Sequence, residues 1–195
     1  MHADLLDLND GVANRGVAAI LGLLASSGRT SRLWEVRQKH ELPPMDSELW
    51  VLSGGPGSPL AEGPWRAPLL AALRARIAED RPTLAICYGF ELLGHALGAE
   101  LRELTTPRDG VFPLRLTLGD PRFSGLQGAG AYEGRRWGVF GEVGEVLATG
   151  GEGDLTAARF GQRGLGVIFH PEADLGPDTA LVYSTLIPRY LAGLR

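Results

Sequence analysis

The segment around the single cysteine combines a nucleophilic side chain with the small neighbours that a tight turn requires. Cys87 ends a short apolar run, Thr83–Cys87, and a helical pattern, Gly89–Leu97, follows almost at once. Ala85 and Gly89 are small enough for the chain to turn sharply at this point. The start of the following helix favours a thiolate on the turn. The spacing therefore indicates a cysteine nucleophile, and a buried structural cysteine is the alternative.

A histidine and a glutamate stand two residues apart near the C-terminal end of the chain. His170 and Glu172 follow the apolar run Gly166–Ile168. Residues two apart in extended chain project to the same side, so both side chains can face one site. A base that takes a thiol proton needs an orienting partner, and a carboxylate fixes the tautomer of histidine. A lone histidine at a strand end is more often a polar cap, but with Cys87 ending another strand we interpret the three residues as one site.

A glycine-rich loop follows another apolar run and contains a third set of candidate residues. Glycines let backbone N–H groups approach a ligand closely, as an oxyanion hole requires. No Gly-Lys-Ser/Thr follows the loop, so it is not a phosphate-binding loop. An ordinary tight turn is the alternative for this loop taken alone. The candidate residues are Gly54, Gly55, Pro56 and Gly57.

The elements that must position these residues alternate short apolar runs with helical stretches. This alternation predicts βα units around a parallel sheet, in one domain over residues 1–195. The stretch from Gly125 to Gly153 is rich in glycine and is expected to form hairpins and irregular loops. Predicted strands are Ala3–Leu8, Arg32–Val36, Leu49–Ser53, Thr83–Cys87, Val111–Leu118 and Leu165–His170, and predicted helices are Asn14–Ser27, Pro64–Glu79, Gly89–Leu97 and Thr179–Leu191.

Composition and charge exclude several classes of function. The 195 residues are 44% hydrophobic and 22% charged, a balance typical of a folded chain. The formal net charge of -4 provides no basic field for nucleic acid, and no apolar run is long enough to span a membrane. One cysteine and four dispersed histidines give no zinc-ligand spacing, so we expect no metal and no cofactor. Met1–Asp10 lacks the basic residues of a signal peptide, and we expect a cytoplasmic protein.

Taken in order, the glycine loop, the cysteine turn and the C-terminal His-Pro-Glu resemble the class I (triad-type) glutamine amidotransferases, and among them the stand-alone GMP-synthase-like members. That family has a Gly-Gly-Pro-Gly loop, then Gly-x-Cys-x-Gly-x-Gln, then His-Pro-Glu. Leu92–Leu101 is similar to the family's helix after the cysteine, and Val146–Thr149 to an apolar strand. The resemblance implies a three-layer α/β/α sandwich with a mainly parallel central sheet, as in flavodoxin-like folds.

The resemblance also implies an activity and assigns roles to residues. Cys87 would attack the side-chain amide of L-glutamine and form a γ-glutamyl thioester, with His170 as the base and Glu172 as its orienting partner. Backbone N–H groups of Gly55 and Tyr88 would hold the oxyanion. Ammonia would pass to a separate synthetase subunit, because no synthetase domain fits in 195 residues.

Three positions depart from the family's pattern. Ala85 replaces the first glycine of the cysteine motif, and Ile168 stands where many members have glutamine. Glu91 occupies the position of the family's glutamine beside the substrate, where a carboxylate would repel a substrate carboxylate or pair with the amine of another substrate. Two alternatives follow: a stand-alone hydrolase or transferase for another γ-glutamyl compound, and a non-catalytic binding or regulatory module that keeps the fold.

Overall fold

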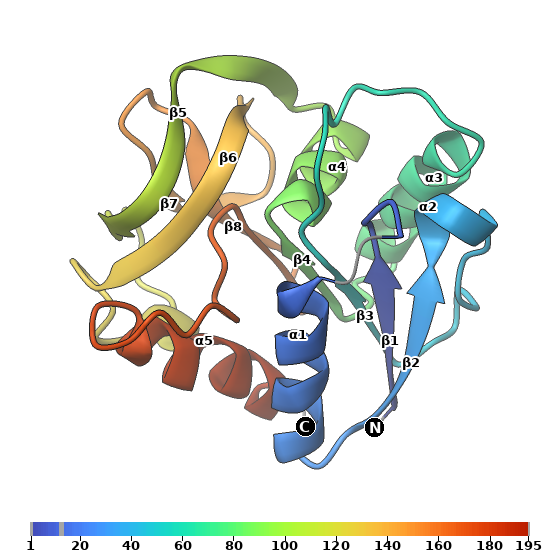
Figure 1. Ribbon diagram of the computed structural model, residues 1–195, viewed down its shortest axis with the longest axis horizontal. Coiled ribbons are helices and arrows are strands. Elements are labelled where there is room, and N and C mark those ends of the chain that lie inside the picture. The colour runs from blue at the N-terminus through green and yellow to red at the C-terminus, as the bar shows by residue number, and fades with distance from the viewer. Residues whose placement is uncertain (1, 12–13, 195) are drawn as a thin grey trace.

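The fold is built on a seven-stranded, mainly parallel sheet (Figure 1). The computed structural model describes residues 2–11 and 14–194. Counted across the sheet, the first five strands pair with one another in parallel, and the last two pairings, between the fifth, sixth and seventh strands, are antiparallel. In spatial order they are β2 (Thr30–Glu35), β1 (His2–Asp7), β3 (Leu49–Leu52), β4 (Thr83–Ile86), β9 (Gly164–Val167), β8 (Leu155–Phe160) and β7 (Glu145–Thr149).

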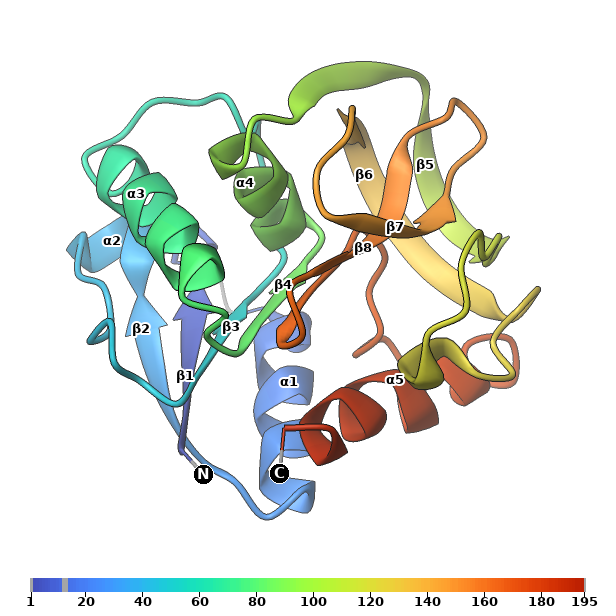
Figure 2. The same ribbon diagram turned by 180° about the vertical axis from the view of Figure 1, so that it is seen from behind.

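Helices cover both faces of this sheet, which gives the predicted three-layer α/β/α arrangement. One face carries α1 (Arg15–Ser26) and α5 (Ala180–Ala192), which lie side by side in the lower half of Figure 1. The other face carries α2 (Val36–Lys39), α3 (Arg66–Ala78) and α4 (Tyr88–Ala96); Figure 2 brings α3 and α4 forward. A short 3-10 turn, η1 (Pro121–Phe123), packs beside α5. Among the described helices none is both long and apolar enough to cross a membrane.

Strand β3 shows why the sheet needs helices on both sides. Leu49 and Val51 belong to the core under α1 and α5, while Trp50 and Leu52 belong to the core under α3 and α4. Successive side chains of a strand point to opposite faces, so a continuous apolar run of this kind is buried on both. Each such side chain stabilises the fold by about 1.5–3 kcal/mol through burial.

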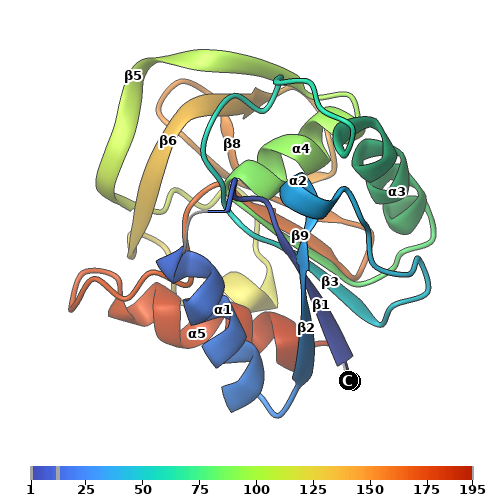
Figure 3. The same cartoon turned by 45° about the vertical axis from the view of Figure 1, so that its right-hand side comes forward.

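A separate two-stranded antiparallel ribbon, β5 (Glu100–Pro113) and β6 (Gly130–Phe140), stands beside the main sheet. Figure 3 shows the ribbon at the same end of the molecule as the loop that follows β3. A buried ion network attaches it to the sheet. Arg135 pairs with Glu133 on its own strand at 2.7 Å and with Asp154, just before β8, at 2.5 Å. Arg108 of β5 pairs with Glu133 at 2.6 Å.

Most predicted elements are confirmed within one or two residues, including Val146–Thr149 as part of β7. The strand predicted at Arg32–Val36 is shifted, because Val36 already begins α2. The strand predicted at Leu165–His170 ends at Val167. The segment Leu92–Leu101, which resembles a helix of the family, is helical only to Ala96. Its last two residues belong to β5.

Two predictions around the ribbon are wrong. Only the first three residues of the predicted strand Val111–Leu118 are in a strand, the end of β5, because Pro113 cannot donate a hydrogen bond to continue the pairing. The stretch Gly125–Gly153 is not mainly irregular, since it contains β6 and β7. Its inward-facing residues include the charged pair Glu133 and Arg135, so the sequence lacks the alternation of apolar and polar residues that marks a strand.

The ion network predicts a large stability loss when one partner is removed. Arg135→Met leaves the carboxylate of Asp154, whose side chain is 1% exposed, without its cation. We expect the free energy of unfolding, measured by urea denaturation, to fall by about 3–5 kcal/mol. The control is Glu145→Gln, which breaks an ion pair with Arg159 on the surface and should cost less than about 1 kcal/mol. Equal losses in the two variants would contradict the assigned role of Arg135.

Candidate active site

Cys87 occupies the turn between β4 and α4 in a backbone conformation that non-glycine residues rarely adopt. Its φ is 49° and its ψ is -112°. Such strain persists only where surrounding contacts enforce it. Here the N–H of Cys87 donates to the carbonyl of Val167 at 2.8 Å, and its carbonyl accepts from the N–H of Glu91 at 3.0 Å. The turn is therefore fixed from both sides, by β9 and by the first turn of α4.

Gly89 allows α4 to begin directly against the end of β3. A Cβ at this position would lie 2.7 Å from Cβ of Leu52 and 3.0 Å from the carbonyl oxygen of Ser53. The N–H of Gly89 donates to the same carbonyl of Ser53 at 3.2 Å. Only glycine leaves room for this approach, which explains the small residue two positions after Cys87. Ala85, two positions before it, is fully buried in β4.

His170 and Glu172 lie next to each other, as the sequence predicted. Nδ1 of His170 lies 2.8 Å from Oε1 of Glu172. Although β9 has already ended at Val167, the N–H of His170 donates to the carbonyl of Tyr132 on β6 at 2.8 Å. After this single bridge the chain turns, because the N–H of Ala173 donates to the carbonyl of His170 at 3.1 Å. The side chains of His170 and Glu172 therefore meet across a turn, and not through the extended chain that the spacing indicated.

The electrostatic surroundings favour a protonated His170. Burial alone would lower the pKa of its imidazole, but the charge and hydrogen bond of Cys87, together with those of Glu172, raise the pKa well above its ordinary value. Glu172 is itself buried beside Gly16, at the beginning of α1. The helix dipole there favours a negative charge. The three side chains therefore form one electrostatically coupled group.

The glycine loop approaches this group through its backbone. A Cβ on Gly54 would lie 2.7 Å from Cε1 of His170 and 3.5 Å from Cβ of Cys87. A Cβ on Gly55 would lie 2.5 Å from the carbonyl oxygen of Leu8. Side chains at either position would displace the imidazole or the end of β1. The loop thus needs its two glycines for packing, whatever ligand it binds.

Arg37 holds the loop in place from outside. Its Nη1 donates to the carbonyl of Pro56 at 2.8 Å and to that of Leu8 at 3.1 Å. The guanidinium also lies 5.4 Å from the ring centre of Tyr88, within the range of a cation–π contact. The Tyr88 hydroxyl donates to the carbonyl of Ser58 at 3.2 Å. The side chain of Tyr88 therefore supports the loop instead of facing the cavity.

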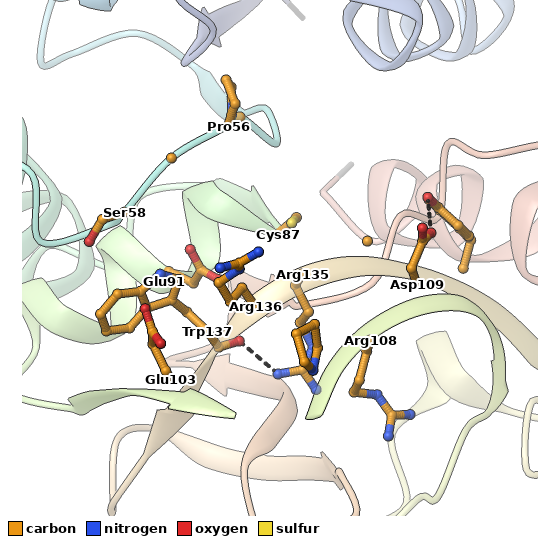
Figure 4. Close-up of a pocket in the computed structure, with 15 residues that line it drawn as sticks. Pro56, Ser58, Cys87, Glu91, Glu103, Arg108, Asp109, Arg135, Arg136 and Trp137 are labelled. Atoms are coloured by element: carbon orange, nitrogen blue, oxygen red, sulfur yellow. Dashed lines mark hydrogen bonds between the residues drawn. The ribbon is translucent and has the colours of Figure 1, made fainter. Parts of the chain in front are cut away.

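Two hollows meet at Cys87. The larger, about 640 Å³, is bounded on one side by the glycine loop, on another by Cys87 and Glu91, and on the third by the ribbon (Figure 4). The smaller, about 150 Å³, is lined by Gly54, His170 and Glu172. Of the predicted site residues, Gly55, Pro56, Gly57, Cys87 and Glu91 line the first, and Gly54, Gly55, Cys87, His170 and Glu172 line the second. The described residues contain no cluster suited to a metal ion.

Glu91 is buried on the cavity wall, and burial changes its protonation. Desolvation raises the pKa of its carboxyl to about 8, although the charges of Arg135 and His170 act in the opposite direction. At neutral pH the side chain is therefore mostly a neutral carboxylic acid. The repulsion expected from a carboxylate at this position is largely absent, because the neutral group carries no charge and, like a primary amide, has both a donor and an acceptor group.

The ribbon supplies a part of the site that the sequence did not indicate. Tyr132 contacts His170, with ring centres 5.8 Å apart, and donates through its hydroxyl to Asp109 at 2.9 Å. Arg136 and Trp137 line the cavity from β6. Since the strand itself was not predicted, its alternation could not assign these side chains to the cavity. The role of Arg37 could not be predicted from the sequence either, because its contacts are with backbone carbonyls distant in sequence.

Together these features define an α/β protein with a strained cysteine at a strand–helix turn, a histidine–carboxylate pair beside it and a glycine loop opposite. The sequence model of the protein family "Glutamine amidotransferase class-I" matches residues 17–187 of this chain. The chain belongs to this family.

Individual relatives agree with the family. The chain is 33% identical over 154 residues to a glutamine-hydrolysing GMP synthase of Phenylobacterium zucineum, covering 74% of this chain and 28% of that protein. A glutamine-hydrolysing GMP synthase of Lactococcus lactis is 33% identical over 127 residues, covering 63% and 24% respectively. The chain thus spans about a quarter of the length of these curated relatives.

Solved structures show the same fold. A glutamine amidotransferase from Methylobacillus flagellatus superimposes with a TM-score of 0.81 at 15% identity, over 98% of this chain and 91% of the other. One from Thermotoga maritima gives a TM-score of 0.77 at 15% identity, over 98% and 95%.

The buried Glu91 predicts a distinct pH dependence of stability. Its pKa rises from about 4.5 to about 8 on folding, so between these values the folded state binds more protons than the unfolded state. The free energy of unfolding must then fall as pH rises through this window. Glu91→Gln removes that titration. We expect the variant to gain stability over the wild type between pH 4.5 and 8, by a few kcal/mol at about 1.4 kcal/mol per pKa unit, with a constant difference above pH 8.

Urea denaturation of both proteins across this pH range measures the difference. Glu103→Gln, at an exposed position of the same cavity, is the matched control and should show no such pH dependence. A stability difference between wild type and Glu91→Gln that does not change with pH would contradict the buried neutral acid.

Proposed function

We propose that the protein is a glutaminase that hydrolyses the side-chain amide of L-glutamine through Cys87, His170 and Glu172. The sulfur of Cys87 attacks the amide carbon, and a C–S bond forms as the C–N bond breaks. His170 takes the proton of the thiol before the attack, which gives the imidazolium that its surroundings favour, and then delivers this proton to the leaving nitrogen, which departs as ammonia. Water then attacks the thioester, the C–S bond breaks, and glutamate and the free thiol result. Glu172 orients His170 and stabilises its charged form.

The observation that carries this proposal is the left-handed backbone of Cys87 beside the His170–Glu172 pair. A strained non-glycine residue on a strand–helix turn is costly for the fold, and such strain is found mainly at functional sites. The 2.8 Å contact between His170 and Glu172 supplies the oriented base that a thiol nucleophile requires. A structural cysteine would need neither feature, so both support the enzyme over the non-catalytic module.

The oxyanion of the tetrahedral intermediate requires backbone donors on the side of the glycine loop. We assign this role to the N–H groups of Gly55 and Tyr88. Tyr88 is the first residue of α4, and N–H groups in the first turn of a helix have no acceptor within the helix. Gly55 lines both hollows at Cys87. Gly54, Pro56 and Gly57 shape the loop that presents Gly55 to the substrate.

Glu91 is compatible with glutamine as the substrate. The family has glutamine at this position, and a neutral carboxylic acid offers a similar donor and acceptor to the substrate. The burial of Glu91 and its raised pKa, about 8, support this role near neutral pH. The cavity volume of about 640 Å³ lies within the usual range for small-molecule sites and is ample for glutamine.

We assign the ammonia to a separate acceptor enzyme, a synthetase subunit. The relatives named as glutamine-hydrolysing GMP synthases are about four times as long as the matched region, and this chain corresponds to one part of them. A cytoplasmic location accords with this proposal.

Glutamate release from L-glutamine by the purified protein tests the proposal. Wild type should release glutamate, and Cys87→Ser should lower kcat/KM by at least about a thousandfold while leaving the thermal unfolding midpoint nearly unchanged. Cys87 is the sole cysteine of the chain, so the variant removes every thiol.

Two results would contradict the glutaminase. Hydrolysis of a chromogenic γ-glutamyl anilide without hydrolysis of glutamine would indicate that the native substrate is another γ-glutamyl compound. No hydrolysis of either, with iodoacetamide reacting at Cys87 no faster than with free cysteine, would indicate a non-catalytic module.

A further inference from the structure

Three arginines line the larger cavity, and two of them are committed to the ion network. Arg108 binds Glu133 through two hydrogen bonds, at 2.6 and 2.9 Å. Arg135 is shared by Glu133 and Asp154 and also donates to the carbonyl of Trp137 at 2.9 Å. Their charges are balanced by buried carboxylates. Neither guanidinium is available to a ligand without breaking the attachment of the ribbon to the sheet.

The third arginine, Arg136, has no partner for its charge among the described residues. Its guanidinium forms no hydrogen bond or ion pair with any residue that the structure describes. The side chain is exposed and points into the cavity from β6, toward the side where Cys87 and Glu91 lie (Figure 4). Strand alternation explains the difference from its neighbour, because Arg135 faces inward and Arg136 faces the opposite way.

Three carboxyl groups also line the cavity, and they differ in their charge and in their partners. Asp109 accepts a hydrogen bond from the hydroxyl of Tyr132. Glu91 is buried and mostly neutral near pH 7. Glu103 is exposed on the same wall and forms no ion pair with the described residues. The cavity therefore offers one free guanidinium and, at Glu103 and Asp109, carboxylates without an ion pair among the described residues. These groups match the two charges of an amino acid with free α-groups.

We infer that Arg136 binds the α-carboxylate of the γ-glutamyl substrate and so determines specificity for free amino acids over simple amides. This inference rests on the proposed function. A guanidinium pairs with a carboxylate through two parallel hydrogen bonds, which fixes the orientation as well as the charge of the substrate. Held in this way, the substrate directs its γ-amide toward Cys87, which lines the same cavity on a different wall from Arg136.

The test compares L-glutamine with its α-carboxamide analogue, glutaminamide, which keeps the ammonium and the γ-amide but lacks the α-carboxylate. Arg136→Gln should raise KM for glutamine roughly ten- to a hundredfold and change kcat by less than about threefold. It should change kcat/KM for glutaminamide by less than about threefold, because the missing contact is one that this analogue never makes. Arg136→Lys, which keeps the charge without the planar fork, should restore part of the affinity for glutamine.

Arg102→Gln is the matched control, since Arg102 is an exposed arginine of the same ribbon that lies outside the cavity. It should leave both substrates unaffected. Equal losses with glutamine and glutaminamide in Arg136→Gln, or no loss with either, would overturn the inference.

A labelling experiment separates failure of this inference from failure of the glutaminase. A diazoketone analogue of glutamine keeps the α-amino acid end and alkylates a thiol with loss of dinitrogen, whereas iodoacetamide has no such end. Arg136→Gln should slow labelling of Cys87 by the diazoketone about tenfold or more and leave the iodoacetamide rate unchanged. If labelling depends on Arg136 but no glutamate is released from glutamine, the role of Arg136 stands and only the proposed hydrolysis is contradicted. Equal diazoketone rates in wild type and variant, or no labelling of wild type, would overturn the inference.

Discussion

The backbone of Cys87 is the constraint on which the rest of the site depends. A left-handed residue between β4 and α4 would relax into an ordinary turn if its neighbours allowed it. The hydrogen bond to Val167, the close packing of Gly89 against β3 and the full burial of Ala85 prevent this relaxation. As a result the thiol is held at the carboxyl end of the parallel sheet, where the ends of β3, β4 and β9 bring the glycine loop and His170 to the same place.

The second requirement is a wall opposite the thiol, and the ribbon provides it. A two-stranded ribbon has little stability of its own, so it must be attached to something larger. Arg135 makes that attachment through Asp154, and Glu133 extends it to Arg108. The same strand supplies Tyr132, whose carbonyl accepts a hydrogen bond from the N–H of His170 and so fixes the backbone of that residue. The charged interior of the ribbon therefore serves both the fold and the geometry of the site.

Much of the fold could be predicted from the sequence because its parallel strands are buried on both faces and appear as plain apolar runs. The loop after β3, the turn at Cys87 and the pair His170–Glu172 carry local signals of glycine and spacing, and the structure brings them together. The family and the three-layer fold are confirmed, while the catalytic roles and the single domain stay predictions. The ribbon could not be predicted, because Glu133 and Arg135 make its buried positions look exposed. The protonation of Glu91 was also hidden, since it depends on burial by residues distant in sequence.

The proposed reaction requires Cys87 to carry the γ-glutamyl group as a covalent intermediate. Rapid acid quenching of wild-type protein during turnover of isotopically labelled glutamine, followed by mass spectrometry of the peptide that contains Cys87, tests it most directly. We expect a labelled γ-glutamyl thioester on Cys87 that forms before glutamate appears and disappears as glutamine is exhausted. Glutamate formed without any adduct in the pre-steady state, or an adduct on another residue, would contradict it.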